Sequence, residues 1–188
     1  MQNVAARQAV TQSGSVSNGA ELDFSQLFQA HYSRVYNYLR YRVSAPADAE
    51  DIIGAVFEQA YRRREQFDPA RGSFTTWLFS IARHTLVDQY RSRERRSAWE
   101  SEAELPADLV ASEPSPEAYM VQQEMITQML YGLERLNERD REIISLKFAG
   151  KLRNTEIAEI MQMKEKTVSV VLLRAVQRLR QYMTEEVG

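Results

Sequence analysis

The stretch NTEIAEIMQMKEKTVSVVLLRAVQRLR, residues 154–180, decides how the C-terminal part of the chain folds. Its first part has a short apolar set at helical spacing: Ile157, Ala158 and Ile160. Its second part has an apolar stripe at spacings of four, three and four residues: Val168, Leu172, Ala175 and Leu179. Two such helices joined by a short turn are typical of a helix-turn-helix, whose second helix lies in the DNA major groove. A generic helical hairpin is the alternative interpretation.

The second helix presents an unusual outer face for a DNA reader. Once the apolar stripe is assigned to the core, the positions left for the groove are Lys164, Lys166, Ser169, Val170, Leu173, Arg174 and Gln177. Groove-reading helices are expected to carry basic and amide side chains. Val170 and Leu173 are therefore anomalous. They either pack on thymine methyl groups or belong to an apolar patch that binds a protein.

The rest of the chain divides by composition. Residues 1–20 are rich in Gln, Ser, Asn, Ala and Gly, and we expect a disordered tail. Residues 21–96 and 120–183 show helical periodicity, whereas 97–119 carry six acidic residues, three Pro and no Lys or Arg. Strand-like alternation is nearly absent. The sequence predicts an all-α protein with two small helical domains joined by a flexible acidic linker.

Arginine and aromatic residues interleave within 61–96, a composition suited to nucleic acid. Aromatic rings stack on unpaired bases and arginines neutralise phosphates. Trp77 lies on an apolar stripe and is expected in the core, so Phe67 and the 68–73 loop are better candidates for exposed contact. The acidic residues Asp48 and Asp51 are interpreted as a helix start and not as a metal or acid–base site.

Several function classes are excluded or disfavoured. The 188 residues contain no Cys and two distant His, and no catalytic motif or phosphate-binding Gly loop is present. We therefore expect no catalytic residues, metal or cofactor, and no enzymatic activity. No apolar run approaches the ~20 residues of a membrane span, so a cytoplasmic location without membrane insertion is expected. The net charge of −2 is spread unevenly, because the acidic excess lies in 97–119.

Two stretches together resemble a known family. DAEDIIGAVFEQAYRRREQFDPARGSFTTWLFSIARHTLVDQYRSRERR (48–96) resembles the second conserved region of extracytoplasmic function (ECF) sigma factors, of the sigma-70 family. LERLNERDREIISLKFAGKLRNTEIAEIMQMKEKTVSVVLLRAVQRLR (133–180) resembles their fourth region. The order of the two stretches and the acidic linker between them also match, and the resemblance covers about residues 22–183.

The resemblance implies a bacterial transcription initiation factor that binds core RNA polymerase and carries it to promoters. The domain of residues 21–96 would recognise and melt the −10 element, and that of 120–183 would bind the −35 element and the polymerase flap. The implied contacts to the polymerase clamp coiled-coil are Asp48, Asp51, Ile52 and Phe57. The implied −10 contacts are Phe67, Arg71, Ser73, His84, Arg91, Arg93, Arg95 and Arg96. Proteins of this family are commonly held by an anti-sigma factor, so one is a possible partner.

The chain departs from the family pattern at both surfaces. Gly54 and Ala55 replace polar residues of the clamp-binding helix, and two basic residues are missing from the reading helix. Lys164 replaces the favoured Ser N-cap, and Gln162 stands where the turn usually has Gly. Two other functions stay open: a stand-alone helix-turn-helix regulator, and a sigma-like interaction protein with weakened promoter binding.

Overall fold

The computed structural model describes residues 24–96 and 116–185, with side chains described for 24–92 and 124–184. Every regular element in these ranges is helical. The elements in chain order are α1 (Phe24–Arg40), α2 (Pro46–Arg62), the 3-10 turn η1 (Arg64–Gln66), α3 (Phe74–Arg96), α4 (Pro116–Glu134), α5 (Glu138–Ile144), the π-helical turn η2 (Ser145–Ala149), α6 (Asn154–Met161) and α7 (Glu165–Glu185). The all-α prediction is confirmed.

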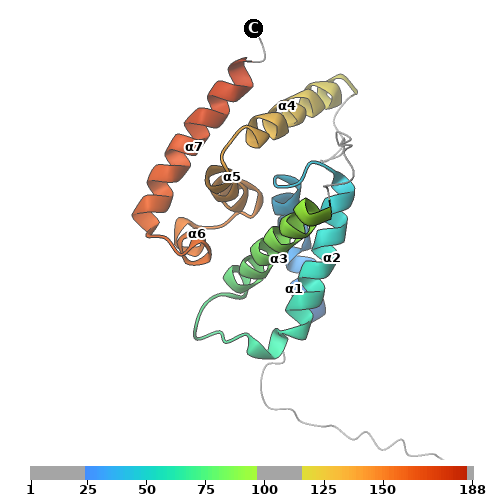
Figure 1. Ribbon diagram of the computed structural model, residues 1–188, viewed down its shortest axis with the longest axis vertical. Helices are drawn as coiled ribbons and strands as arrows, with labels where there is room; N and C mark the ends of the chain where they lie inside the picture. The colour runs from blue at the N-terminus through green and yellow to red at the C-terminus, as the bar shows by residue number, and fades with distance from the viewer. Residues whose placement is uncertain (1–23, 97–115, 186–188) are drawn as a thin grey trace, which may run out of the picture.

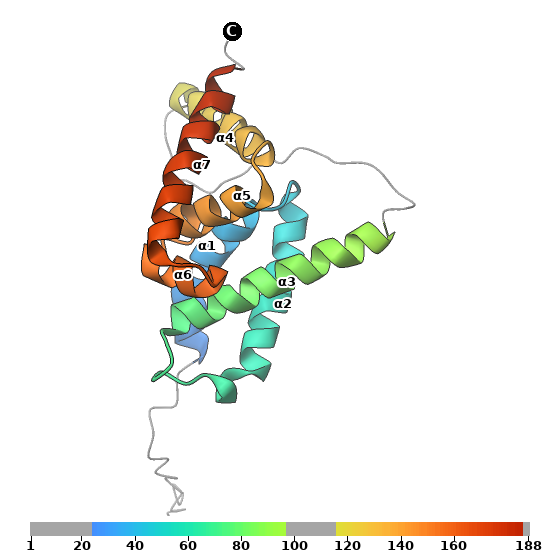
Figure 2. The same ribbon diagram turned by 60° about the vertical axis from the view of Figure 1, so that its left-hand side comes forward.

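Helices α1, α2 and α3 form the N-terminal half of the molecule, on the right in Figure 1. Helix α2 buries an apolar stripe at helical spacing, which consists of Ile52, Ile53, Val56, Phe57 and Ala60. Helix α3 begins where the Ser73 hydroxyl accepts a hydrogen bond from the Thr76 backbone N–H at 3.1 Å, as an N-cap does. Its last turns stand clear of the other helices in Figure 2.

Helices α4 to α7 form the C-terminal half. Asn137 caps α5 by accepting a hydrogen bond from the Asp140 backbone N–H at 3.0 Å. The buried Asp140 carboxylate is paired with Arg178, which ties α5 to α7. The predicted helix-turn-helix is α6 followed by α7, and Gln162 adopts the left-handed conformation between them, with φ 52°. Helix α4 begins at Pro116, inside the range 97–119 predicted as linker, because Pro suits a first helical position.

The two halves pack against each other over a shared apolar core. One continuous cluster contains Leu39 of α1, Phe79 of α3, Leu146 of η2 and Ile157 of α6. In Figure 1, α5 and η2 face α1 and α3, and α6 lies beside α3. The C-terminal half therefore rests directly on the N-terminal half, which the expectation of two separate domains did not include.

Candidate nucleic-acid and polymerase surfaces

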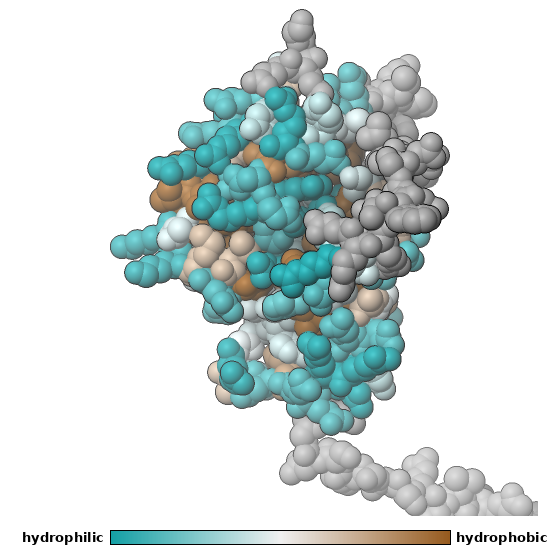
Figure 3. Space-filling model, in the orientation of Figure 1, coloured by the Kyte–Doolittle hydropathy of each residue, from teal (hydrophilic) through white to brown (hydrophobic). Residues whose placement is uncertain are grey.

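Six of the seven positions predicted for base and phosphate contact lie on the outer face of α7, and the seventh, Lys164, immediately precedes this helix. Each of these side chains is exposed, including the apolar Val170 at 49% and Leu173 at 62%. The inner face is buried at Val168, Val171 and Ala175. Figure 3 shows an apolar patch on the edge formed by α7, surrounded by hydrophilic surface. The helix therefore has one face for the core and one face free for a partner.

Two positions on the α7 face have structural duties as well. The Ser169 hydroxyl donates to the Glu165 carbonyl at 3.2 Å and accepts from the Asn154 amide at 3.0 Å. Its one hydrogen is therefore used within the protein. Lys164 stands at the N-cap of α7, where its carbonyl accepts from the Val168 N–H at 3.1 Å, but a lysine side chain cannot accept the N–H groups that Ser would.

The loop between η1 and α3 carries an exposed arginine and begins at an aromatic cluster. The Asp68 carboxylate accepts from the Ala70 N–H at 2.9 Å and the Asp68 carbonyl accepts from the Arg71 N–H at 3.0 Å, which makes a tight turn. Arg71 is exposed on this turn. Phe67 is half-buried, because its ring packs on Trp77 with 5.5 Å between centroids. Phe67, expected as a candidate for exposed contact, thus has only part of its ring exposed, and Trp77 packs against the core as predicted.

Farther along α3, His84 and Arg91 are exposed. Nδ1 of His84 lies 2.7 Å from the Ser80 carbonyl oxygen, so Nδ1 must carry the hydrogen. Nε2 is then left to accept a hydrogen bond from a partner. Helix α3 continues to Arg96, but the side chains of Arg93, Arg95 and Arg96 lie outside the described residues.

Helix α2 divides the four residues expected to bind polymerase. Asp51 is exposed and Asp48 is half-exposed at its first turns. Ile52 and Phe57 are only 4% and 5% exposed and belong to the core. Their side chains are not available to a partner in this conformation, in agreement with their apolar spacing. Gly54 is exposed on the same helix, and a Cβ added there would meet no atom within 4 Å.

A buried polar network joins the two halves. The Tyr38 hydroxyl of α1 donates to Glu142 of α5 at 2.7 Å, and Glu142 also pairs with Arg42 at 3.1 Å. Arg42 additionally pairs with Glu138. Burial raises the pKa of Tyr38 well above its usual value, and the Glu142 carboxylate raises it further. Burial alone would lower the pKa of Arg42, but the Glu142 and Glu138 carboxylates hold it above its usual range.

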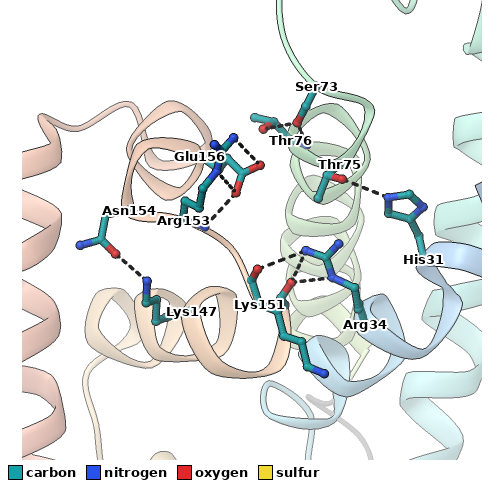
Figure 4. Close-up of polar contacts among 11 residues, drawn as sticks. His31, Arg34, Ser73, Thr75, Thr76, Lys147, Lys151, Arg153, Asn154 and Glu156 are labelled. Atoms are coloured by element: carbon teal, nitrogen blue, oxygen red, sulfur yellow. Dashed lines mark hydrogen bonds and ion pairs between the residues drawn. The ribbon is translucent and has the colours of Figure 1, made fainter.

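A second junction lies at the end of η2. The Arg34 guanidinium donates to the Gly150 carbonyl at 2.7 Å and to the Lys151 carbonyl at 3.3 Å, as Figure 4 shows for Lys151. A Cβ added to Gly150 would lie 2.9 Å from the Phe79 ring. The sequence pattern predicted neither of these two junctions. No local signal marks them, since each joins residues about a hundred positions apart.

The helix-turn-helix also carries one perturbed carboxyl group. Glu156 accepts from the Arg153 backbone N–H at 2.8 Å at the start of α6 (Figure 4). Burial would raise the pKa of Glu156, but this hydrogen bond and the Arg153 guanidinium lower it below its usual value. Among the described residues, no group of His, Cys, Asp and Glu could hold a metal ion, and no helix is long and apolar enough to cross a membrane.

The fold and the exposed faces define a class: helical proteins that present a helix-turn-helix beside a second helical unit with an arginine-bearing loop. Residues 27–96 match the family Sigma-70 region 2, and residues 127–179 match the family Sigma-70, region 4. The first range contains most of α1 and all of α2 and α3, and the second contains the end of α4, all of α5, η2 and α6, and most of α7.

Curated relatives and solved structures agree with these matches. The chain is 31% identical to the ECF RNA polymerase sigma factor RpoE of Cereibacter sphaeroides, covering 87% of this chain and 88% of that protein. It is 30% identical to the ECF RNA polymerase sigma factor BldN of Streptomyces coelicolor over 87% of this chain, which spans only 61% of BldN. The fold is similar to that of sigma factor RpoE from Bartonella quintana, solved with the anti-sigma factor NepR, at a TM-score of 0.71 and 20% identity, covering 86% and 97% of the two chains. The chain belongs to the ECF sigma factors of the sigma-70 family, and it is a transcription initiation factor.

Proposed function

We propose that α7 binds the −35 promoter element, that the 67–73 loop and the exposed face of α3 bind the −10 element, and that α2 binds core RNA polymerase. The observation that carries the proposal is the outer face of α7. Six exposed positions lie there on the second helix of a helix-turn-helix, among them the cationic Lys166 and Arg174, and the cationic Lys164 is exposed just before the helix. Cationic side chains around a groove-reading face fit the phosphates of a DNA duplex.

The −10 assignment rests on the loop before α3. Arg71 is exposed in this loop, four residues after the half-buried Phe67, and His84 has a free Nε2 farther along the helix. Melted DNA offers unpaired bases and phosphates together, which suit an aromatic edge and a guanidinium. Arg91 and the Arg93–Arg96 run would then contact the phosphates that follow.

Fewer residues of α2 are exposed for contact with polymerase than the family resemblance implies. Asp48 and Asp51 offer carboxylates at the start of α2, while Ile52 and Phe57 would act by holding this helix in place. Gly54 leaves the middle of the exposed face without a side chain. The contact with the clamp would therefore rely on charge near the first turns of the helix.

Promoter binding by both elements requires the two halves to separate. A Cβ placed on Gly72 of the −10 loop would lie 4.0 Å from the Glu159 carboxylate of α6. In a promoter, elements centred near −10 and −35 are roughly 85 Å apart at about 3.4 Å per base pair. The packed arrangement would thus be a resting state in the cytoplasm, which polymerase opens. An anti-sigma factor, as in the complex of the Bartonella quintana RpoE, would be a partner of this state.

Reconstituted transcription tests the proposal. The full chain would be added to core RNA polymerase, and promoter-specific initiation would be measured together with a footprint over the −35 region. Arg174→Ala is expected to weaken the −35 footprint and leave co-elution with core polymerase unchanged. An intact footprint would refute the assignment of α7. Co-elution without initiation would support the sigma-like interaction protein, and DNA binding without polymerase would support the stand-alone regulator.

A further inference from the structure

The exposed face of α7 is a regular stripe with an apolar centre. Lys166, Val170, Leu173, Gln177 and Arg180 follow at spacings of four, three, four and three residues, so they lie on one side of the helix. All five are exposed. Val170 and Leu173 belong to neither core cluster. Packing within the protein therefore does not account for these two apolar side chains, and a binding partner would.

The charges around these two side chains favour a polyanionic partner. Lys166 and Arg180 close the stripe at its two ends, and Arg174 lies one turn beyond Val170. No acidic residue belongs to the stripe. A duplex with phosphates on both sides of an apolar strip in its groove matches this pattern. A purely apolar protein groove would leave the three cations without partners.

The chemistry of the base edges then selects one base. Guanine, cytosine and adenine present only hydrogen-bonding groups in the major groove, whereas thymine also presents its 5-methyl group. Val and Leu side chains would leave the acceptors of guanine or the donor of cytosine buried without a partner. Ser169, the neighbouring hydroxyl, has its hydrogen committed to Glu165. Thymine is the base that these two side chains complement.

The spacing along the helix sets how far apart the two bases lie. Val170 and Leu173 are three residues apart, which is a rise of about 4.5 Å along an α-helix. Base pairs are stacked about 3.4 Å apart, so the two side chains reach neighbouring steps. Resting on the proposed binding of α7 to the −35 element, we propose that Val170 and Leu173 read the 5-methyl groups of thymines at neighbouring positions. Gln177, one turn farther on, is placed to read an adenine.

Uracil substitution tests this proposal, because deoxyuridine keeps the thymine O4 and lacks only the 5-methyl group. Holoenzyme made from the full chain and core polymerase would select duplexes from a pool of promoters randomised over the −35 region. The selected duplex would then be remade with deoxyuridine at one thymine at a time. Each contacted methyl group is expected to weaken binding about fourfold when removed, equivalent to about 0.8 kcal/mol.

Variants connect each methyl group to a side chain. Leu173→Ala and Val170→Ala should each bind more weakly and lose sensitivity to deoxyuridine at one position. Both residues are exposed, so these variants should fold, and Met125→Ala truncates another exposed apolar side chain as a control. Selection of guanine or cytosine at these positions would overturn the proposal. So would deoxyuridine substitutions that weaken binding equally for the unmodified protein, Val170→Ala and Leu173→Ala. So would an unchanged selection by Leu173→Ala, which would assign the patch to a protein. No enrichment at all over the −35 region would instead refute the assignment of α7.

Discussion

Replacing Tyr38 with phenylalanine tests how strongly the two halves of the molecule are held together. The Tyr38 ring is fully buried and packs edge-on against Phe79, with 5.6 Å between ring centroids. Phenylalanine keeps this packing and removes only the hydrogen bond from the hydroxyl to Glu142, which is 2.7 Å long. A hydrogen bond to a charged group stabilises by about 1.5–3 kcal/mol. Since Glu142 keeps its ion pair with Arg42, we expect a loss near ~1.5 kcal/mol at the low end of that range.

A loss of this size would raise the open fraction of the protein about tenfold. Energy transfer between two dyes can measure it, because the chain has no cysteine and two can be introduced as unique attachment sites. Exposed Glu50 of α2 and Gln181 of α7 place one dye on each half. Tyr38→Phe should increase the population with low transfer. Tyr131→Phe, which changes a half-exposed ring, should leave the distribution as it is in the unmodified sequence.

A second substitution, Glu142→Gln, should open the molecule more than Tyr38→Phe does. This change leaves Arg42, which is 1% exposed, with Glu138 as its one described carboxylate partner. Breaking a buried ion pair costs about 3–5 kcal/mol when the remaining charge has no partner, and because Glu138 stays in place we expect a loss near the lower end of that range. The open population should therefore rise in the order unmodified, Tyr38→Phe, Glu142→Gln. If Tyr38→Phe lowers the free energy of unfolding while the transfer distribution stays unchanged, the network stabilises each half separately. The inference that it controls opening would then be refuted.

Further changes test the local structure. Gly54→Ala should raise the free energy of unfolding by ~1 kcal/mol, because a Cβ at this position meets no atom. Gly150→Ala should lower the free energy of unfolding by roughly 1–3 kcal/mol, because its Cβ would lie 2.7 Å from a carbonyl oxygen. Urea unfolding measures both changes, and equal effects of the two substitutions would contradict this prediction. Lys164→Ser should stabilise the fold by about 1 kcal/mol through an N-cap hydrogen bond and weaken −35 binding, as measured by urea unfolding and DNA titration. The pKa of Glu156 is lowered in the folded state, so its contribution to stability is present above the unfolded-state pKa and is lost as the pH falls through the folded-state pKa. The free energy of unfolding should therefore decline below about pH 4.5. Glu156→Gln should make that decline shallower when unfolding is followed by circular dichroism.

Some of the candidate site follows from local pattern. A helix repeats every 3.6 residues, so once Val168 and Ala175 are assigned to the core, the outer position of Leu173 follows. The structure confirms the exposure of the outer face of α7. The same helical periodicity places Ile52 and Phe57, two of the expected polymerase contacts, on the buried side of α2.

Other features depended on contacts between distant parts of the chain. Phe67 sits in a loop whose residues have no periodic pattern, and its half-burial against Trp77 depends on the path of the loop. The small size of Gly150 matters because α3 delivers Phe79 against it. Neither position carries a local mark that separates this role from an ordinary turn.

The sequence by itself determined the helices, the helix-turn-helix, the family and the outward face of α7, because these depend on spacings of a few residues. Only the tertiary structure decided that the two halves close on each other. Tyr38 and Glu142 are 104 positions apart, and either could face solvent on an isolated helix. Burying a hydroxyl and two charges is favourable only when their partners arrive together. These partners come together only when the helices of the two halves pack, so no single stretch of sequence reveals the contact.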